Sequence, residues 1–308
     1  MIKRTIDISE QAYVHLKHQQ LLIDKKGETV AQIPIEDIGT LILQHPAIVL
    51  TQAAIITCQK HNVALVFCDE RYLPYSLLLP ISDGNNLHAK ILKQQIALTL
   101  PTKKRLWGQI VKQKIANQAE TLKTLDKTYL PLERLASKVK TGDPDNLEAQ
   151  AAQKYWRLLF GDQFRRDTEL DGINSVLNYG YAIIRAMLAR AIVGSGLHPA
   201  LGLFHSNQYN GLCLADDLME PFRPWVDYKV YLMANDHPEL EVCKETKVPL
   251  LKLLAEPVLW EQQSLPLMVA CHYLLANLKR AYEDSTVSIN FPQRLTETLK
   301  IPSPGGRG

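Results

Sequence analysis

The sequence predicts an α+β protein of two domains, a small N-terminal β-rich domain followed by a larger all-α domain. Up to about residue 80, apolar and polar residues alternate as they do in strands, whereas from about residue 87 apolar residues recur at helical spacing. The composition, 46% hydrophobic and 22% charged, is that of an ordinary globular protein. We therefore expect a β-rich domain at residues 1–80, a linker at 81–86, a helical domain at 87–300 and a disordered, Pro/Gly-rich tail at 301–308.

The N-terminal domain is expected to be a hairpin or short meander with one helix. Residues 13–17 and 21–24 alternate, and the turn signal Lys25-Lys26-Gly27-Glu28 leads into a further strand at 29–33. Thr51 is a good N-cap for a helix from Gln52 to about His61. Further strands are expected at residues 40–43, 63–68 and 75–79.

The second domain is expected to be a bundle of helices without strands. Gly194-Ser195-Gly196 marks the end of one helix clearly. The apolar spacing predicts helices over residues 87–99, 102–126, 131–140, 146–160, 172–194, 212–234, 247–256 and 264–283.

Cysteine usage and hydropathy indicate a cytoplasmic protein. The five cysteines are odd in number and form no Cys-x-x-Cys pair, which favours neither a disulfide framework nor a zinc ribbon. The first residues lack the apolar stretch of a signal peptide. The most apolar helical segment, 181–197, contains Arg185 and Arg190 and is too short and too charged to span a bilayer, so no membrane association is expected.

Basic residues concentrate in one segment, although the formal net charge of the chain is only +3. Between Ala89 and Lys127 nine Lys or Arg residues stand against Glu120 and Asp126, a local charge of +7. Polyanion binding is one interpretation. A solvated helix face is the other.

No phosphate loop, Gly-x-Ser-x-Gly or His-Glu-x-x-His motif is present, so catalytic residues would have to come from segments far apart in the sequence. Three such segments contain suitable residues. The first contains Glu148, whose alternative role is a capping box with Asp145. The second is the polar loop 202–210 with His205, a residue type that is more often structural. His198 is a nearby competitor, but His198-Pro199 is more typical of a turn.

The third segment contains two carboxylates, Asp217 and Glu220, three residues apart and therefore on one helix face. Two such groups repel each other unless a cation lies between them. The alternative is an acidic turn that faces solvent. Pro221 and Pro224 predict an irregular helix here.

Taken together, these segments resemble one protein family, the CRISPR-associated integrase that is the first of the two universal adaptation proteins. The similarity covers about residues 3–290 and looks closest to the type II branch. The matching stretches, in order, are 34–39, 67–69, 148–152, 171–181 (with Tyr179-Gly180-Tyr181), 202–205 and 217–224.

The resemblance implies a metal-dependent DNA endonuclease and integrase that inserts prespacer DNA into a CRISPR array during antiviral defence. The family's metal ligands map onto Glu148, His205 and Glu220, and Asp217 matches a further acidic position, next to the ligands or on the ion. The β-rich domain would form a homodimer. Two dimers would flank a dimer of the small second adaptation protein, with type II accessory proteins as further partners and double-stranded DNA, prespacer and repeat, as substrate.

The implied reaction suits these residue types. The free 3′-hydroxyl of the prespacer attacks a phosphodiester in the repeat, and a hard cation can orient the phosphate and stabilise its charge. Oxygen ligands suit Mg²⁺, and one imidazole makes Mn²⁺ an alternative. DNA contacts are expected mostly on phosphates. The candidates are Arg165, Arg166, Arg185, Arg223, Lys229, Lys103, Lys104 and Arg105, with Tyr179 and Gln208 stacking on or bonding to a DNA end.

Two rival functions fit the same sequence. A metal-dependent nuclease would cut DNA or RNA without joining it, and a non-catalytic scaffold would need the basic surface but no metal. Arg185 has an alternative role as the buried partner of a carboxylate.

Overall fold

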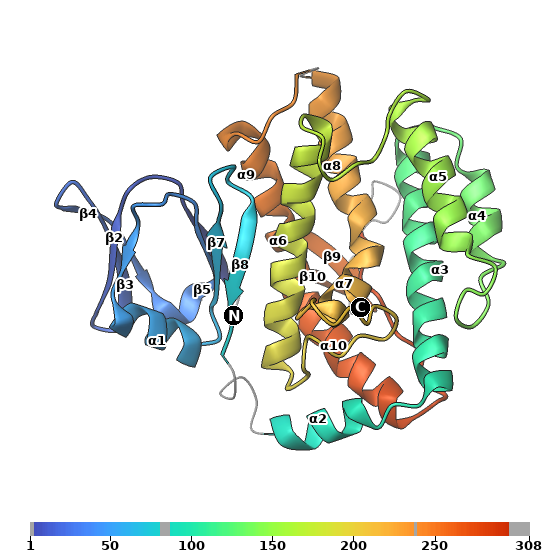
Figure 1. Ribbon diagram of the computed structural model, residues 1–308, viewed down its shortest axis with the longest axis horizontal. Coiled ribbons are helices and arrows are strands. Elements are labelled where there is room, and N and C mark those ends of the chain that lie inside the picture. Colours follow the sequence, from blue (N-terminus) through green and yellow to red (C-terminus); the bar gives the residue numbers. More distant parts are fainter. Residues whose placement is uncertain (1–2, 81–86, 237–238, 296–308) are drawn as a thin grey trace, which may run out of the picture.

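The N-terminal domain consists of two four-stranded sheets around an aliphatic core (Figure 1). The computed structural model describes residues 3–80, 87–236 and 239–295, so the expected linker and tail lie outside the described residues. One sheet has the order β1-β5-β7-β8 and the other β4-β3-β2-β6. The elements are β1 Arg4–Ile8, β2 Tyr13–Lys17, β3 Gln20–Lys25, β4 Glu28–Pro34, β5 Ile38–Leu43, β6 Val49–Leu50, α1 Gln52–Lys60, β7 Ala64–Cys68 and β8 Pro74–Leu78.

In the first sheet, β5 and most of β7 are buried, and these two strands separate the N-terminal core from the core of the helical domain. Every residue of β5 is buried, and its neighbours β1 and β7 run parallel to it. Leu41 and Leu65 face the N-terminal core, whereas Ile42 and Val66 face the core of the helical domain. This explains why β5 and β7 are largely apolar runs, whereas β2, which turns only Val14 and Leu16 to the N-terminal core, alternates between apolar and polar residues.

The helical domain is organised around two long helices, α3 and α6 (Figure 1). By length and composition α6 could cross a membrane, but 78% of its most apolar window is buried inside the protein, as in a core helix. Gly180 lets α6 approach α8, because a Cβ there would lie 2.4 Å from Val226. The helices are α2 His88–Ile96, α3 Leu100–Thr124, α4 Leu130–Ala136, α5 Leu147–Phe160, α6 Ile173–Gly194, α7 Cys213–Met219, α8 Arg223–Asp236, α9 Lys244–Lys252 and α10 Leu267–Glu283, with 3-10 turns at Glu220–Phe222 and Leu253–Ala255.

The prediction of an all-α second domain is wrong in one region. A small sheet forms there from β9 (Pro257–Trp260), β10 (Gln263–Pro266) and β11 (Gln293–Arg294). Glu261 takes a left-handed conformation, φ 54°, in the turn that joins β9 to β10. The helix expected from residue 264 therefore begins only at Leu267, because the preceding residues pair as a hairpin.

The predicted irregularity near residue 220 is confirmed. The helix expected over 212–234 is divided into α7, a 3-10 turn and α8, with Pro221 in the turn. Pro221 has no backbone N–H to continue the helical hydrogen bonds.

One strand was not expected from the sequence. Residues 4–8 form β1 because they pair with β5.

Candidate active site

Glu148 lies in the first turn of α5, one residue after its start at Leu147, and is not part of the helix cap. Asp143 caps this helix, because its carboxylate oxygens accept hydrogen bonds from the backbone N–H groups of Leu147 (2.9 Å) and Glu148 (3.0 Å). The capping box of Asp145 with Glu148 is therefore wrong. The Glu148 side chain instead accepts a hydrogen bond from Lys114 of α3. Because it is not needed to cap the helix, it can take part in a site.

Lys114 lies between two glutamates. Its Nζ is 2.6 Å from Glu148 Oε1 and 2.5 Å from Glu220 Oε2, and Arg223 Nε is 2.9 Å from Glu220 Oε1. Lys114 is 9% exposed and Glu220 4% exposed. Two carboxylates from distant segments thus meet at one buried cation, as charge repulsion requires.

Buried charges keep each other ionised here. Burial by itself would raise the pKa of Glu220, but the charges of Arg223 and Lys114 outweigh it and hold that pKa below its ordinary value. Burial likewise favours the neutral form of Lys114, yet Glu220 and Glu148 raise its pKa above the ordinary value. Lys114 is therefore an ammonium and Glu220 a carboxylate at neutral pH.

The turn that contains Glu220 is anchored to α3. The side-chain amide of Asn117 donates a 2.7 Å hydrogen bond to the carbonyl of Pro221. Asp217 and Glu220 are both buried, at 0% and 4% exposure, so the alternative of an acidic turn facing solvent is wrong. The two carboxylates also have different partners, which separates their roles.

Asp217 organises the loop of His205. Its carboxylate accepts hydrogen bonds from the backbone N–H groups of Leu203 (2.6 Å), Phe204 (3.1 Å) and His205 (3.1 Å), and it lies 2.7 Å from His205 Nδ1. Gly202 is required at this close approach, because a Cβ there would lie 2.3 Å from the His205 carbonyl oxygen. The hydrogen bond to Asp217 raises the pKa of His205 and leaves Nε2 as its available ring nitrogen.

The donor set fits a hard cation at the two glutamates. Carboxylate oxygens are the ligands that Mg²⁺ and Mn²⁺ prefer, and Glu148 and Glu220 already converge on one positive charge. Within the described ranges, no group of three or more His, Cys, Asp or Glu side chains is arranged to hold a metal ion. His205 as the third ligand stays a prediction. Asp217 already accepts hydrogen bonds from four donors, one of them His205, which favours the role of orienting His205 over direct contact with the ion.

An aromatic pair lies beside His205. Phe204 stacks on Trp107 with ring centroids 4.3 Å apart, and His205 meets Trp107 edge-on at 5.9 Å. Phe204 is 56% exposed. Sequence reasoning missed Trp107, Phe204 and Lys114. One available signal was the spacing of Trp107 and Lys114, which are seven residues apart and therefore lie on one face of α3.

Arg223 connects the site to a buried tyrosine and aspartate. Its guanidinium lies over the Tyr181 ring, 4.6 Å from the centroid, and the Tyr181 hydroxyl donates to Asp227. Burial raises the pKa of Asp227 to about 7. Through Arg223, Tyr181 and Asp227 are linked to Glu220, while Gly180 allows α6 to pack closely on α8. The last two residues of the Tyr-Gly-Tyr motif therefore have structural roles.

Most of the basic residues predicted to bind DNA have partners within the protein. Arg185 pairs with a carboxylate, as its alternative role predicts, through bidentate contacts with Asp216 at 2.5 and 2.9 Å, but its side chain is 36% exposed and not buried. The other internal partners are Asn174 and Asn178 for Arg166, Glu220 for Arg223, Glu256 for Lys229, and the carbonyls of Ala281 and Val287 for Arg105.

The remaining candidates differ in accessibility. Tyr179 is fully buried, so its ring cannot stack on DNA and that prediction is wrong. Lys104, Arg165 and Gln208 are exposed, and Lys103 is half-buried. Their DNA contacts stay predictions. Of the nine cations in the basic segment, Lys114 is committed to the site itself, which weakens the idea of one uniform basic face.

The fold and site define an α+β protein whose helical domain holds two glutamates, one buried and one partly exposed, around one buried cation. The chain belongs to the family described as CRISPR associated protein Cas1, whose model matches residues 8–239. The resemblance drawn from the motifs is thereby confirmed, as is the α+β class.

Named relatives agree with this family. The chain is 36% identical over 287 residues to a CRISPR-associated endonuclease Cas1 from Neisseria meningitidis serogroup C, covering 92% of this chain and 93% of the relative. Among solved structures, a casposase bound to integration product has a TM-score of 0.79 at 20% identity, covering 97% and 96% of the two chains. A Cas6-RT-Cas1–Cas2 complex has a TM-score of 0.73 at 18% identity, covering 93% of this chain and 36% of that one.

Proposed function

We propose that this chain is a metal-dependent DNA endonuclease and integrase that inserts prespacer DNA into a CRISPR array. The observation that supports this most directly is the convergence of Glu148 and Glu220 on one cation in a member of the Cas1 family. The relative from Neisseria meningitidis is named an endonuclease, and the casposase was solved with an integration product.

The reaction is a transesterification. The 3′-hydroxyl oxygen of the prespacer forms a bond to phosphorus, the bond from phosphorus to the 3′-oxygen of the repeat strand breaks, and the proton lost by the first oxygen is balanced by one gained by the second. A Mg²⁺ or Mn²⁺ ion held by Glu148, Glu220 and His205 would orient the phosphate and neutralise its oxygens. Asp217 fixes the ring of His205, and Arg223 fixes Glu220.

The proposed partners follow the family. They are double-stranded DNA, a second copy of this chain, and the small second adaptation protein in an assembly of two dimers around one. A solved complex whose name includes both Cas1 and Cas2 supports the last of these.

Glu148→Gln tests the proposal directly. Gln keeps an acceptor for Lys114 but removes the charge that a metal needs, so we expect joining of a labelled prespacer to a supercoiled repeat plasmid to fall by at least ~10³-fold, with DNA binding retained. Glu133→Ala, an exposed residue of α4, is the matched control and should join at the wild-type rate.

The outcomes separate the rival functions. Joined product in the wild type, lost in Glu148→Gln, supports integration. Degradation without joining supports a nuclease. Joining that survives in Glu148→Gln rejects the site, and DNA binding without any reaction supports a scaffold.

A further inference from the structure

The position between Glu148 and Glu220 is already filled by a side chain of the protein. The Lys114 ammonium contacts Glu148 Oε1 at 2.6 Å and Glu220 Oε2 at 2.5 Å, while Arg223 occupies the other oxygen of Glu220. Lys114 comes from the middle of α3, and its side chain is only 11% exposed. The Lys114 and Glu220 ends of the contact are therefore buried, whereas the Glu148 side chain is 23% exposed.

A divalent ion and this ammonium would need the same oxygens. Mg²⁺ binds carboxylate oxygen at about 2.0–2.1 Å, so an ion bridging the two glutamates would lie where the Lys114 Nζ now lies. An ion bound to Glu148 Oε1 and Glu220 Oε2 could not share that point with the ammonium, because both are positive. Binding of an ion to these two oxygens would require Lys114 to move away.

We propose that Lys114 is a built-in counter-ion that holds Glu148 and Glu220 together in the metal-free protein and is displaced by the divalent ion. The inference rests on the proposed function in one respect, that a divalent ion binds at these glutamates. Lys114 is then a positioning residue. It prevents repulsion between the two carboxylates, and it weakens metal binding by competing for the same oxygens.

Calorimetric titration of the full chain with Mn²⁺ alone tests the competition. In Lys114→Met we expect the Kd for Mn²⁺ to be at least tenfold lower than in the wild type, because no ammonium has to leave. Lys112→Met is the matched control. It removes an exposed lysine two residues earlier on α3 and should leave the Kd unchanged within twofold.

Thermal unfolding tests the counter-ion role without metal. Lys114→Met should lower the Tm in EDTA and show a larger Tm increase with saturating Mn²⁺ than the wild type. In EDTA, Lys114→Met/Glu148→Gln should have a higher Tm than Lys114→Met, because removing one charge removes the repulsion. This double variant also keeps the proposal testable if Lys114→Met unfolds without metal.

The results distinguish this inference from the proposed function. Equal or weaker Mn²⁺ binding by Lys114→Met overturns the competition, because Lys114 would then assist or ignore the ion. Absence of Mn²⁺ binding in both wild type and Lys114→Met overturns the inference and the proposed metal site together. The predicted binding changes without any joining by the wild type would support the inference and reject integration.

Discussion

The two domains differ in what they bury. The N-terminal core consists entirely of apolar side chains, and the buried polar residues described in that domain are Thr40 and Gln44. The helical domain instead buries Lys114, Asp217, Glu220 and Asp227. Because buried charge is costly unless it is paired, this contrast separates a domain built for stability from one built around a site.

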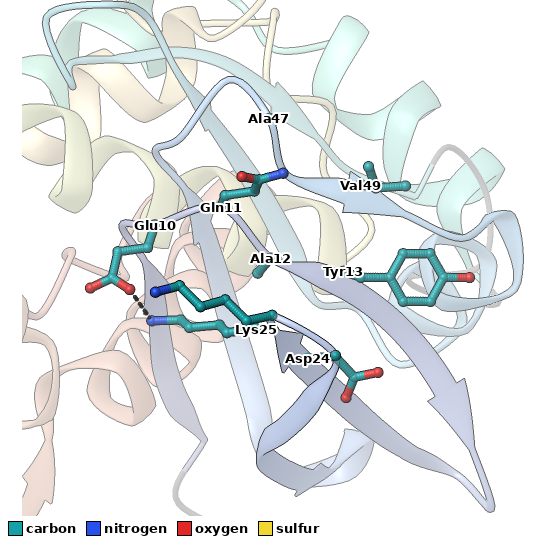
Figure 2. A pocket seen from close by; sticks show the side chains of 10 residues that line it. Glu10, Gln11, Ala12, Tyr13, Asp24, Lys25, Ala47 and Val49 are labelled. Atoms are coloured by element: carbon teal, nitrogen blue, oxygen red, sulfur yellow. Dashed lines mark hydrogen bonds and ion pairs between the residues drawn. The ribbon is translucent and has the colours of Figure 1, made fainter.

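Charged residues of the N-terminal domain lie at its surface, whereas those of the site are mostly buried. The N-terminal domain has an open groove of about 590 Å³ beside β2 and β3, where Lys25 pairs with Glu10 at 2.9 Å (Figure 2). This pair is largely exposed, and Tyr13 at the groove is 46% exposed. The charged residues described at this groove are exposed or half-buried, whereas Glu220 is buried.

The largest expected effect is that of Asp217→Ala. It leaves three backbone N–H groups and His205 without their acceptor, so we expect a loss of about 3–5 kcal/mol in the free energy of unfolding, measured by urea denaturation. Mn²⁺ binding should weaken as well, because the ring of His205 is no longer oriented.

Leu41→Ala is the comparison for the N-terminal core. Leu41 is fully buried there, and its truncation should cost about 2–5 kcal/mol with the Kd for Mn²⁺ unchanged. If Leu41→Ala weakened Mn²⁺ binding as much as Asp217→Ala, the division between a stabilising domain and a site domain would fail.

Asp227 makes the stability of the helical domain depend on pH. Its folded-state pKa is raised from 3.8 to about 7, so between these values the folded protein binds a proton that the unfolded chain has lost, and stability falls as pH rises. Relative to Asp227→Asn, the wild type should lose about 3 kcal/mol between pH 5 and pH 8. Parallel pH profiles of the two proteins, measured by urea denaturation, would show instead that Asp227 stays ionised.

The smallest effect is expected for Lys25→Ala. The ion pair with Glu10 is exposed and solvent-screened, so the Tm should not change measurably. A clear fall in Tm would mean that surface charge contributes to the N-terminal domain more than the contrast with the helical domain implies.

Much of the architecture follows from local pattern. Thr51 caps α1 through the backbone N–H of Ala54, as its position before an apolar run predicts. Apolar spacing also located α3 and α6 to within about two residues. β1 and the small sheet of β9, β10 and β11 escaped, because their pairing depends on strands brought near by the rest of the fold.

The site divides in the same way. Glu148, His205 and Glu220 were predicted from motifs, because residue type and order can be read from the sequence alone, and His205 as a ligand stays a prediction. Lys114 was counted only as one more charge in a basic segment, and Asp145 was preferred to Asp143 as the cap of α5. In both cases several side chains of the same type lie close in the sequence, and only the folded structure decides which of them makes the contact.

The sequence by itself determined the α+β class and the family, and it predicted the residue types of the site. Spacing and motif order are properties of the chain before it folds. The tertiary structure alone decided that Lys114 lies between Glu148 and Glu220, that Asp217 supports His205 and that Tyr179 is enclosed. The first of these outcomes depends on the packing of α3 against α5 and against the turn at Glu220, because the distance between charges and their burial set how strongly they interact.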